Sequence, residues 1–419
     1  MANAVLKFRS RVAILGSGPA ALMAADVISA AGHSVTVFEK RKGPGRKLLI
    51  AGSSGLNIGN SLPQSEFIRH YRGGDEGFWE RVFRAFPSSS WLGFIESLGL
   101  KTFEGTSGRH FVDAMDEASL NSLKPSKGSK LLSNWIRRLR AQAVQFSFES
   151  ECTGFTLTPN GQILLSLSPL TESGEFSAVC FCLGGGSWEP EETPLRWPEI
   201  FKSRHLGFET FVAANCGFQV AWPQAFLTEA EGLPLKTFSM TSPRGTKKGE
   251  AVITSYGIEG TPVYTVGITG SVLLDLKPDL DLRQVLVRLS VPGENLSPIR
   301  RVKKYLGLCP VALALVFHLT PKEILSDLNQ LCERIKRFPL ELLGPQPLTE
   351  AISSSGGLKL TELDEGFMLR KFPGVFAAGE MLDWDAPTGG FLIQACVSQG
   401  YLAGQSICRF LEPKKMSAR

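Results

Sequence analysis

Near the start of the chain, a continuous apolar run at residues 12–15 leads into a glycine-containing turn and a helix-like stretch. An uninterrupted apolar run is typical of a strand in a parallel sheet that is covered on both faces. The helical pattern reaches about Ala31 and stops at Gly32, and a second strand pattern occupies residues 34–38. This order predicts a strand–helix–strand unit with parallel strands.

The hydrophobic pattern changes in the middle of the chain. Residues 208–275 contain short apolar runs separated by turn signals, and residues 280–338 read as short helices. Strand patterns return at residues 357–360 and 374–378, before a helical pattern at 392–410. The individual segments predicted within the middle region are strands at 251–254 and 263–266 and helices at 299–306 and 321–337.

The turn after the first strand has the spacing Gly16-x-Gly18-x-x-Ala21. Gly16 permits a tight turn, Gly18 lets the backbone approach a pyrophosphate, and Ala21 allows the helix to pack closely on the strand. The N-terminus of the following helix offers free N–H groups to an anion. Its first residues, Pro19 and Ala20, therefore belong to the predicted dinucleotide site.

Glu39 ends the second strand, 21 residues after Gly18, where a carboxylate can accept hydrogen bonds from both hydroxyl groups of a ribose. An acidic residue at this place favours a free 2′-hydroxyl group, so NADP is disfavoured and NAD and FAD remain. No second fingerprint of this kind occurs in the sequence, which gives no support to a separate nicotinamide-binding domain.

A long glycine-rich and basic loop, residues 40–60, follows Glu39. Long ordered loops are usually functional. Basic side chains in this loop could offset the charge of a pyrophosphate, and its glycines and serines could pass close to a flat ring. The loop and the apolar strand with its glycines at 179–187 supply further predicted cofactor contacts, which are Lys40, Arg46, Lys47, Ser53, Ser54, Asn57, Gly184 and Gly185.

Composition and charge limit the class of protein and the ligands that we expect. The chain has 419 residues, of which 43% are hydrophobic and 20% charged, as expected of a globular protein with two or three domains. The formal net charge of +5 is too small to imply nucleic-acid binding by itself. The five histidines lack metal-ligand spacing, so we expect no metal.

The spacing of the cysteines and the hydropathy of the chain indicate the cellular compartment of the protein. The eight cysteines contain no CxxC spacing, which fits a reducing cytosol. Cys180 and Cys182 point to the same side of one strand, which disfavours a disulfide bond. The longest apolar run outside the first motif, residues 310–317, is too short to span a membrane, so we expect a cytoplasmic protein.

Seven segments occur in a fixed order along the chain, and these are RVAILGSGPAALMAA, GRKLLIAGSSGLN, SGRHF, CLGGGSW, AANCGF, GEAVITSYGIEGTPVY and GEMLDWDAPTGGF. In these segments the chain resembles the FAD-binding flavoproteins of the BaiN/YhiN type, which are broadly aminoacetone-oxidase-like. Much of that family has GGGRCN where this chain has GSSGLN. The chain therefore keeps Asn57, lacks the arginine and the cysteine, and resembles a serine-containing branch.

The resemblance implies an α/β fold and FAD as the cofactor. A Rossmann-like FAD-binding domain would be built from both chain ends, residues 1–205 and 346–419. The insertion between them would consist of a β-barrel-like subdomain at 206–278 and a small helical subdomain at 279–345.

The segment at residues 379–391 lies between a predicted strand and the C-terminal helical pattern. A flavin that accepts a hydride gains negative charge at N1–C2=O, which N–H groups at a helix N-terminus stabilise. We expect Gly389, Gly390 and Phe391 to present such N–H groups.

Acidic residues precede that turn. In related flavoproteins an acidic residue at the end of this strand holds ribityl hydroxyl groups. The resemblance gives this role to Glu380, next to Gly379, with Asp383 as the second candidate.

The candidates for catalysis and substrate contact are Arg109, Tyr264, Glu259 and Asp385. Arg109 could bind an anionic or carbonyl group, or could form a surface ion pair. Tyr264 is a plausible proton donor, or else an aromatic residue of the barrel. Glu259 lies on the insertion and could face the ring, and Asp385 could border the pocket.

These observations favour an FAD-dependent oxidoreductase that acts on a small organic molecule, with NAD(P)H or oxygen as the other electron partner. Two alternatives stay open. One is an RNA-modifying flavoprotein, for which basic stretches exist at residues 137–140, 300–304 and 414–415. The other is a flavin-binding redox scaffold without turnover.

Overall fold

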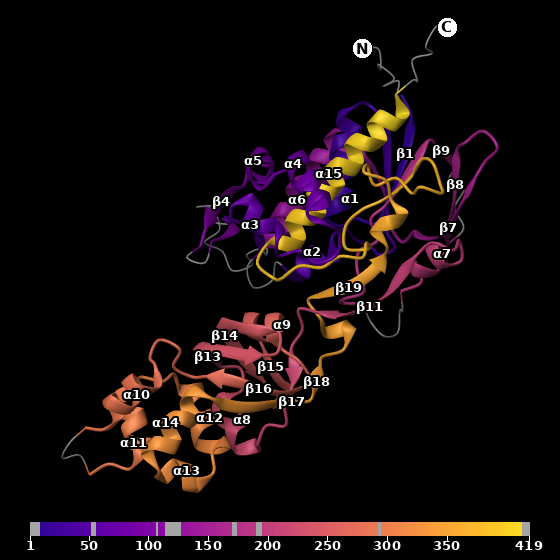
Figure 1. The fold of residues 1–419 in the computed structure, drawn as a ribbon. Coiled ribbons are helices and arrows are strands. Elements are labelled where there is room, and N and C mark those ends of the chain that lie inside the picture. Colours follow the sequence, from indigo (N-terminus) through magenta and orange to yellow (C-terminus); the bar gives the residue numbers. More distant parts are fainter. Residues whose placement is uncertain are drawn as a thin grey trace. The chain divides into compact units, whose positions relative to one another are not determined.

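The computed structural model describes residues 9–51, 56–105, 108–113, 127–169, 174–189, 195–291 and 295–412. The chain divides into two compact units (Figure 1). The terminal unit contains the residues up to 212 and from 354 onward, and the inserted unit contains residues 213–353. The chain passes between them in two paired strands, β11 (Phe208–Ala214) and β19 (Ser353–Leu358).

A five-stranded parallel sheet forms the centre of the terminal unit, in the order β20-β10-β1-β2-β6. Four of its strands come from the first half of the chain and β20 comes from the C-terminal part, so both chain ends build one sheet. The strands are β1 (Arg11–Leu15), β2 (Ser34–Phe38), β6 (Gln145–Ser147), β10 (Ala178–Phe181) and β20 (Val375–Ala377).

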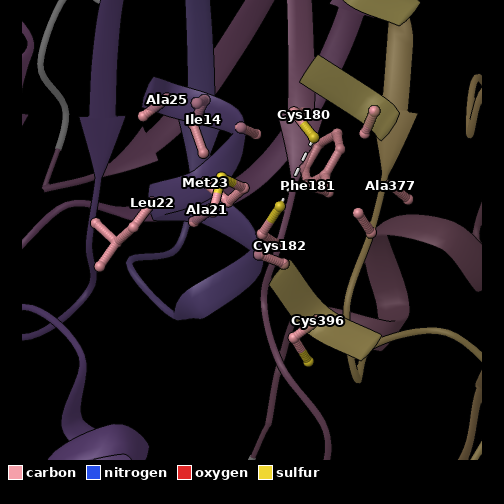
Figure 2. Close-up of a cluster of buried hydrophobic side chains, with 14 of the residues drawn as sticks. Ile14, Ala21, Leu22, Met23, Ala25, Cys180, Phe181, Cys182, Ala377 and Cys396 are labelled. Atoms are coloured by element: carbon pink, nitrogen blue, oxygen red, sulfur yellow. Dashed lines mark hydrogen bonds between the residues drawn. The ribbon is translucent and has the colours of Figure 1, made fainter. Parts of the chain in front are cut away.

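Two helices from opposite ends of the sequence pack closely beside this sheet. Helix α1 (Pro19–Ala30) follows β1, and α15 (Phe391–Leu411) ends the described chain (Figure 1). The contact depends on glycine, because a Cβ on Gly400 would lie 2.2 Å from the carbonyl oxygen of Ala20. Figure 2 shows the apolar core between these elements, with the side chains of Ile14, Met23 and Phe181.

Shorter elements complete the terminal unit. Two three-stranded antiparallel sheets have the orders β3-β5-β4 and β7-β8-β9. Their strands are β3 (Asn57–Asn60), β4 (Lys101–Glu104), β5 (Arg109–Asp113), β7 (Glu151–Leu157), β8 (Ile163–Ser168) and β9 (Glu175–Phe176). The remaining helices are α2 (Arg46–Ala51), α3 (Gln64–Ile68), α4 (Glu76–Ala85), α5 (Ser88–Ser97), α6 (Lys127–Ala141) and α7 (Pro198–Lys202).

The inserted unit contains a seven-stranded antiparallel sheet in the order β17-β16-β13-β14-β15-β12-β18. Its two outer strands, β17 (Phe338–Leu342) and β18 (Gly344–Pro345), are separated only by Leu343. One nearly continuous segment thus pairs with both sides and closes the sheet like a barrel. The other strands are β12 (Phe218–Gln219), β13 (Pro234–Ser242), β14 (Gly245–Thr254), β15 (Gly257–Glu259) and β16 (Gly270–Asp275).

Helices account for the rest of the inserted unit. They are α8 (Gln224–Ala230), α9 (Thr261–Val266), α10 (Leu282–Leu289), α11 (Pro298–Arg301) with a π-helical continuation (Val302–Leu306), α12 (Pro310–Leu319), α13 (Lys322–Ser326) and α14 (Leu328–Lys336). Their apolar faces form a second hydrophobic core, separate from the core of the terminal unit.

Two local predictions for this unit were wrong. Residues 263–266 form part of helix α9 rather than a strand. Gly260 precedes this helix at φ +144°, and Pro262 fits the first turn because its missing N–H has no partner to lose there. The predicted helix at 321–337 is two helices, since Asp327 ends α13 and its carboxylate caps α14 by accepting from the Gln330 N–H at 2.9 Å.

The cysteines of the described residues are all free thiols. The sulfur atoms of Cys180 and Cys182 lie 3.6 Å apart, joined by the dashed line in Figure 2. This separation excludes a disulfide bond between them, as the sequence predicted. Across the described parts of the chain, none of the helices has the length and apolar character needed to cross a membrane.

Candidate functional site

A pocket lies where β1, β2, β10 and β20 end, at the carboxyl edge of the parallel sheet. This is the edge at which open α/β sheets bind their ligands. Eleven of the predicted cofactor residues line it, and these are Gly16, Gly18, Pro19, Ala20, Glu39, Lys40, Arg46, Lys47, Gly184, Gly379 and Glu380. The structure therefore brings together segments that are more than 300 residues apart in the chain.

Other predicted cofactor residues occupy different places. Ala21 is fully buried behind the pocket, where it supports the packing of α1. Ser53 and Ser54 lie outside the described residues. Those that do not line this pocket are Asn57, Gly185, Asp383, Gly389, Gly390 and Phe391.

The two glycines of the fingerprint have different structural roles. Gly16 has φ +100°, and a Cβ there would lie 2.2 Å from the carbonyl oxygen of Cys182. Gly16 is therefore required by the fold itself. A Cβ on Gly18 would contact nothing within 4 Å, although Gly18 lines the pocket. The missing side chain at Gly18 leaves space for a ligand.

Glu39 is held in position by its neighbours. Its Oε2 accepts a hydrogen bond from the Ser17 hydroxyl group, and its Oε1 accepts from the Arg41 N–H at 3.0 Å. Ser17 Oγ in turn accepts from the Gly45 N–H at 3.0 Å. Because each carboxylate oxygen can accept more than one hydrogen bond, Glu39 keeps capacity for ribose hydroxyl groups.

Arg46 supplies an unused donor at the pocket. Its Nη1 is buried and has no hydrogen-bond partner within the described part of the chain. A buried guanidinium nitrogen without an acceptor costs free energy, which an anionic ligand would recover. Lys40 and Arg41 are differently placed, because both contact the Glu189 carboxylate, at 2.9 and 2.8 Å.

Lys47 and Glu380 form a second charged pair in the pocket wall. The Lys47 ammonium donates to the Gly185 carbonyl oxygen at 2.8 Å. Burial lowers the pKa of Lys47, while the Glu380 carboxylate opposes this shift. Burial likewise raises the pKa of Glu380, and the Lys47 ammonium opposes it. Each charge thus partly compensates the desolvation of the other.

Sequence reasoning missed nine residues of the pocket lining. Ser17 could have been predicted, because it lies inside the fingerprint. Glu189 follows the glycine run at 184–186, but the contacts of Glu189 with Lys40 and Arg41 depend on the fold. The missed residues are Ser17, Arg41, Gly45, Leu48, Cys182, Leu183, Glu189, Ala378 and Cys396.

Two of these residues are buried thiols at the pocket wall, labelled in Figure 2. The hydrogen bond between Cys182 and Cys180, together with burial, raises the pKa of Cys182, and burial raises the pKa of Cys396. Thiolate is the reactive form, so a raised pKa leaves less of it at a given pH. We expect iodoacetamide to alkylate these two thiols in the folded protein only well above pH 8.5, the range of an ordinary cysteine.

Mass spectrometry of peptides after alkylation at a series of pH values measures this effect. N-acetylcysteine in the same tube serves as the control for reagent reactivity. Rapid labelling of Cys182 and Cys396 at pH 7 would contradict the expectation.

The predicted flavin turn lies at the start of α15. Gly390 is the N-cap of this helix at φ +91°, and no side chain caps the helix start. Gly390 packs against β3, because a Cβ on it would lie 2.4 Å from the Gly59 carbonyl oxygen. Tyr71 donates to the Phe391 carbonyl oxygen at 2.8 Å, and burial raises the pKa of Tyr71. The turn is therefore fixed from two sides.

Cys396 belongs both to the pocket lining and to the helix that starts at this turn. It lines the pocket and lies on α15, five residues after Phe391. Five helical residues span about 7.5 Å. The turn thus lies roughly this distance along α15 from the pocket residue Cys396.

Arg109 lies beside the turn, whereas Asp385 has a structural role. A Cβ on Gly389 would lie 3.6 Å from Arg109 Nε. Asp385 is buried, forms an ion pair with Arg72 and exchanges backbone hydrogen bonds with it, each 2.9 Å long. The neighbouring Trp384 is also buried and donates to the Gly379 carbonyl oxygen at 2.9 Å. These contacts hold the 379–391 segment together.

The remaining candidates belong to the inserted unit. Tyr264 and Glu259 are half-buried, and the Tyr256 hydroxyl group, which the sequence did not single out, donates to Glu259 Oε2 at 2.8 Å. Burial raises the pKa of both tyrosines, and the Glu259 carboxylate adds to the shift. Both phenols therefore stay protonated, as a proton donor requires.

The fold and the position of the pocket define the class of the protein as a Rossmann-type α/β protein with an inserted unit. The family model described as "HI0933-like protein Rossmann domain" matches residues 10–406. The chain belongs to this family, the FAD-binding family whose motifs it resembles. The expected fold class is thereby confirmed.

Several relatives match nearly the full length of the chain. A 3-dehydro-bile acid delta(4,6)-reductase of Clostridium scindens is 22% identical, over 95% of this chain and 98% of its own length. Ribosomal RNA dihydrouridine synthases of Escherichia coli and Haemophilus influenzae are each 23% identical, over 94% of this chain and 97% and 98% of their own. The prediction of an oxidoreductase is confirmed at the level of enzyme class.

Solved structures share the fold. A 3-ketosteroid-delta4-(5alpha)-dehydrogenase of Rhodococcus jostii superimposes with a TM-score of 0.51 at 12% identity, covering 97% of this chain and 99% of that one. A 3-ketosteroid delta1-dehydrogenase of Sterolibacterium denitrificans gives 0.51 at 11% identity, covering 95% and 99%.

Proposed function

We propose that this protein is an FAD-dependent oxidoreductase that acts on a small organic molecule, with NAD(P)H or oxygen as its second electron partner. The observation that carries the proposal is the pocket at the sheet edge. There, the open space at Gly18 and Arg46 Nη1, which has no partner among the described residues, fit a pyrophosphate. The names of the relatives, which include a reductase, agree with it.

Bound FAD would supply reversible hydride chemistry at its ring. Gly18 and the first N–H groups of α1 would approach the pyrophosphate, and Arg46 would neutralise part of its charge. Glu39 would accept from the ribose, and Glu380 from ribityl hydroxyl groups. The N-terminus of α15, behind Gly389 and Gly390, would stabilise negative charge on the ring.

Spectroscopy of the purified protein tests the proposal. We expect a yellow protein, or an apoprotein that acquires the perturbed absorbance and quenched fluorescence of FAD on titration. FMN, which lacks the adenylate half, should bind more weakly, because it cannot reach Glu39. Stopped-flow reduction by NADH and NADPH, followed by reoxidation in oxygen, then separates an enzyme from a scaffold. A protein that binds neither flavin would refute the proposal.

A basic groove favours RNA modification as a second candidate. The groove has a volume of about 780 Å³ and is lined by Arg41, Lys42, Arg46, Arg137 and Arg140, with no acidic side chain among its described lining residues. Its lining also includes apolar side chains, among them the half-buried Phe148. Cationic side chains around an aromatic ring suit single-stranded nucleic acid. Two of the relatives are named for action on ribosomal RNA.

Charge reversal at the groove tests this candidate. Arg137 and Arg140 line the groove but not the dinucleotide pocket. The double variant Arg137→Glu/Arg140→Glu should bind a short single-stranded RNA at least ~10-fold more weakly at low salt, and the salt slope should fall by about 1.4 if two phosphate contacts are lost.

The variant Arg283→Glu/Arg288→Glu, at two exposed positions of α10 in the inserted unit, is the matched control with the same change in net charge. FAD affinity should be unchanged in both variants. Equal RNA binding by the wild type and the groove variant would exclude the second candidate for this surface.

A further inference from the structure

A cavity of about 630 Å³ lies in the terminal unit, apart from the dinucleotide pocket. It is lined by residues of α4, of the segment 364–368, of β20 and of the last part of α15, and we call it the α4–α15 cavity. Among the described residues, none lines both this cavity and the dinucleotide pocket. Ser406 of the cavity and Cys396 of the pocket are ten residues apart on α15, which is about 15 Å along the helix axis.

The lining of the α4–α15 cavity includes apolar side chains. Phe376 and Leu402 are buried, and Met368 is half-buried. Phe410 stays 41% exposed, although its ring packs edge-to-face against Phe376 with the ring centres 6.0 Å apart. An apolar group that covered Phe410 in the cavity would remove this surface from water, which is favourable.

Arg81, on α4, brings a guanidinium to the same cavity. Its Nε is buried and has no hydrogen-bond partner within the described ranges. Its ion pair with Glu365 is loose, since Nη1 and Oε1 are 3.8 Å apart and the Glu365 side chain is 82% exposed. The guanidinium also lies over the Phe78 ring, 5.9 Å from the ring centre. Because an exposed ion pair of this length contributes little, Arg81 keeps donors for another acceptor.

Two further arginines line the cavity, Arg84 on α4 and Arg409 on α15. Arg84 is 3.9 Å from Glu80, one helical turn earlier, and both side chains are exposed. Arg409 Nη2 donates to the neutral hydroxyl group of Ser406 at 2.9 Å. Neither contact compensates the arginine charge as a short, buried ion pair would.

The carboxylates of the cavity lining do not balance these charges. Asp364 Oδ1 accepts from the N–H groups of Gly366 and Met368, each at 2.9 Å, so this oxygen fixes the backbone of its own segment. With Glu365 as the second carboxylate, the lining has three guanidinium groups and two carboxylates. Guanidinium groups bind carboxylate and phosphate oxygens through paired hydrogen bonds. The excess of donors and of positive charge therefore suits an anionic group.

We propose that the α4–α15 cavity is a binding site for a small amphipathic anion, a molecule with an apolar chain or ring and a carboxylate or phosphate group. The arginines bind the anionic group, and Phe376, Leu402 and Phe410 contact the apolar part. The volume of about 630 Å³ is within the range of sites for small organic molecules, which combine an apolar lining with a few polar groups. The inference is independent of the proposed flavin function, because the two sites share none of the described residues.

Isothermal titration of the full chain with four probes tests the inference. Octanoate and octyl phosphate have both features, octanol has only the apolar chain, and inorganic phosphate has only the charge. We expect octanoate or octyl phosphate to bind once per chain, and octanol and inorganic phosphate to bind ~10-fold or more weakly, because each makes only part of the contacts. Binding of octanoate alone identifies a carboxylate ligand, binding of octyl phosphate alone identifies a phosphate ligand, and binding of both identifies the negative charge as the shared determinant.

The variant Arg81→Met/Arg409→Met should bind the anionic probes ~10-fold or more weakly and should bind octanol like the wild type. Arg69→Met/Arg196→Met, at two exposed positions of the terminal unit outside the cavity lining, is the matched control with the same change in net charge. It should bind all probes like the wild type. Thermal unfolding shows whether each variant is folded, and the comparison of the four probes on the wild type needs no variant.

The inference is overturned if neither anion binds the wild type, if octanol binds as tightly as the anions, or if the folded Arg81→Met/Arg409→Met variant binds the anions unchanged. Competition between octanoate and FAD would also overturn it, because the probe would then occupy the dinucleotide pocket. A wild-type protein that binds the anions and has no affinity for FAD would refute the proposed function and leave this inference intact.

Discussion

Replacing Gly18 with alanine is expected to weaken FAD binding at least ~10-fold while leaving the apoprotein folded, a loss of about 1.4 kcal/mol or more in binding free energy. Gly18 has φ −77° and ψ 179°, which any residue adopts, and its added Cβ would meet no protein atom within 4 Å. The methyl group would occupy only the space into which a pyrophosphate must come. FAD titration by fluorescence quenching measures the affinity, and thermal unfolding of the apoprotein measures the stability.

Alanine substitutions at two other glycines, Gly16 and Gly93, serve as comparisons for this prediction. Gly16→Ala should lower the melting temperature with or without cofactor, because φ +100° strains an alanine and its Cβ would lie 2.2 Å from the Cys182 carbonyl oxygen. Gly93→Ala, in helix α5 with open space around it, should be neutral or stabilising and should not affect FAD. Full FAD affinity in Gly18→Ala would show that the pyrophosphate does not pass this backbone.

The first dinucleotide motif was predictable because its determinants are local in sequence. Strand β1, the turn at Gly16 and Gly18, helix α1 and strand β2 lie within 28 residues, and the structure has them where the pattern placed them. The C-terminal helix was also predicted to within one residue at its start, since Gly389 and Gly390 mark the turn before it. A supersecondary unit can be predicted from the sequence because the residues that determine it lie close together in the chain.

Contacts between segments that are far apart in the chain could not be predicted, because no local sequence pattern marks them. The ion pairs of Glu189 with Lys40 and Arg41 join residues 149 and 148 positions apart. The approach of Arg109 to Gly389 depends on the pairing of β5 with β3 and on the packing of Gly390 against Gly59. The segment at 263–266 was misassigned for a related reason, because its β-branched residues favour a strand while Gly260 and Pro262 start a helix.

Arg46 allows a prediction in which stability and affinity change in opposite directions. In Arg46→Met the apoprotein should become more stable, because a buried Nη1 without a partner in the described residues costs roughly 1–3 kcal/mol and methionine has no polar group to satisfy. FAD should bind ~10-fold or more weakly in the same variant, because a charge-assisted hydrogen bond to a phosphate is worth roughly 1.5–3 kcal/mol.

The two effects are measured on one preparation, by thermal unfolding without FAD and by titration with FAD. Arg69→Met, at an exposed position, is the control and should change neither quantity appreciably. A loss of apoprotein stability with unchanged FAD affinity would mean that Arg46 is a structural residue. A more stable apoprotein with weaker FAD binding would instead show that Arg46 is left unsatisfied in the apoprotein and is satisfied by the cofactor. Such a cost in the free protein is the expected property of a site that binds an anion.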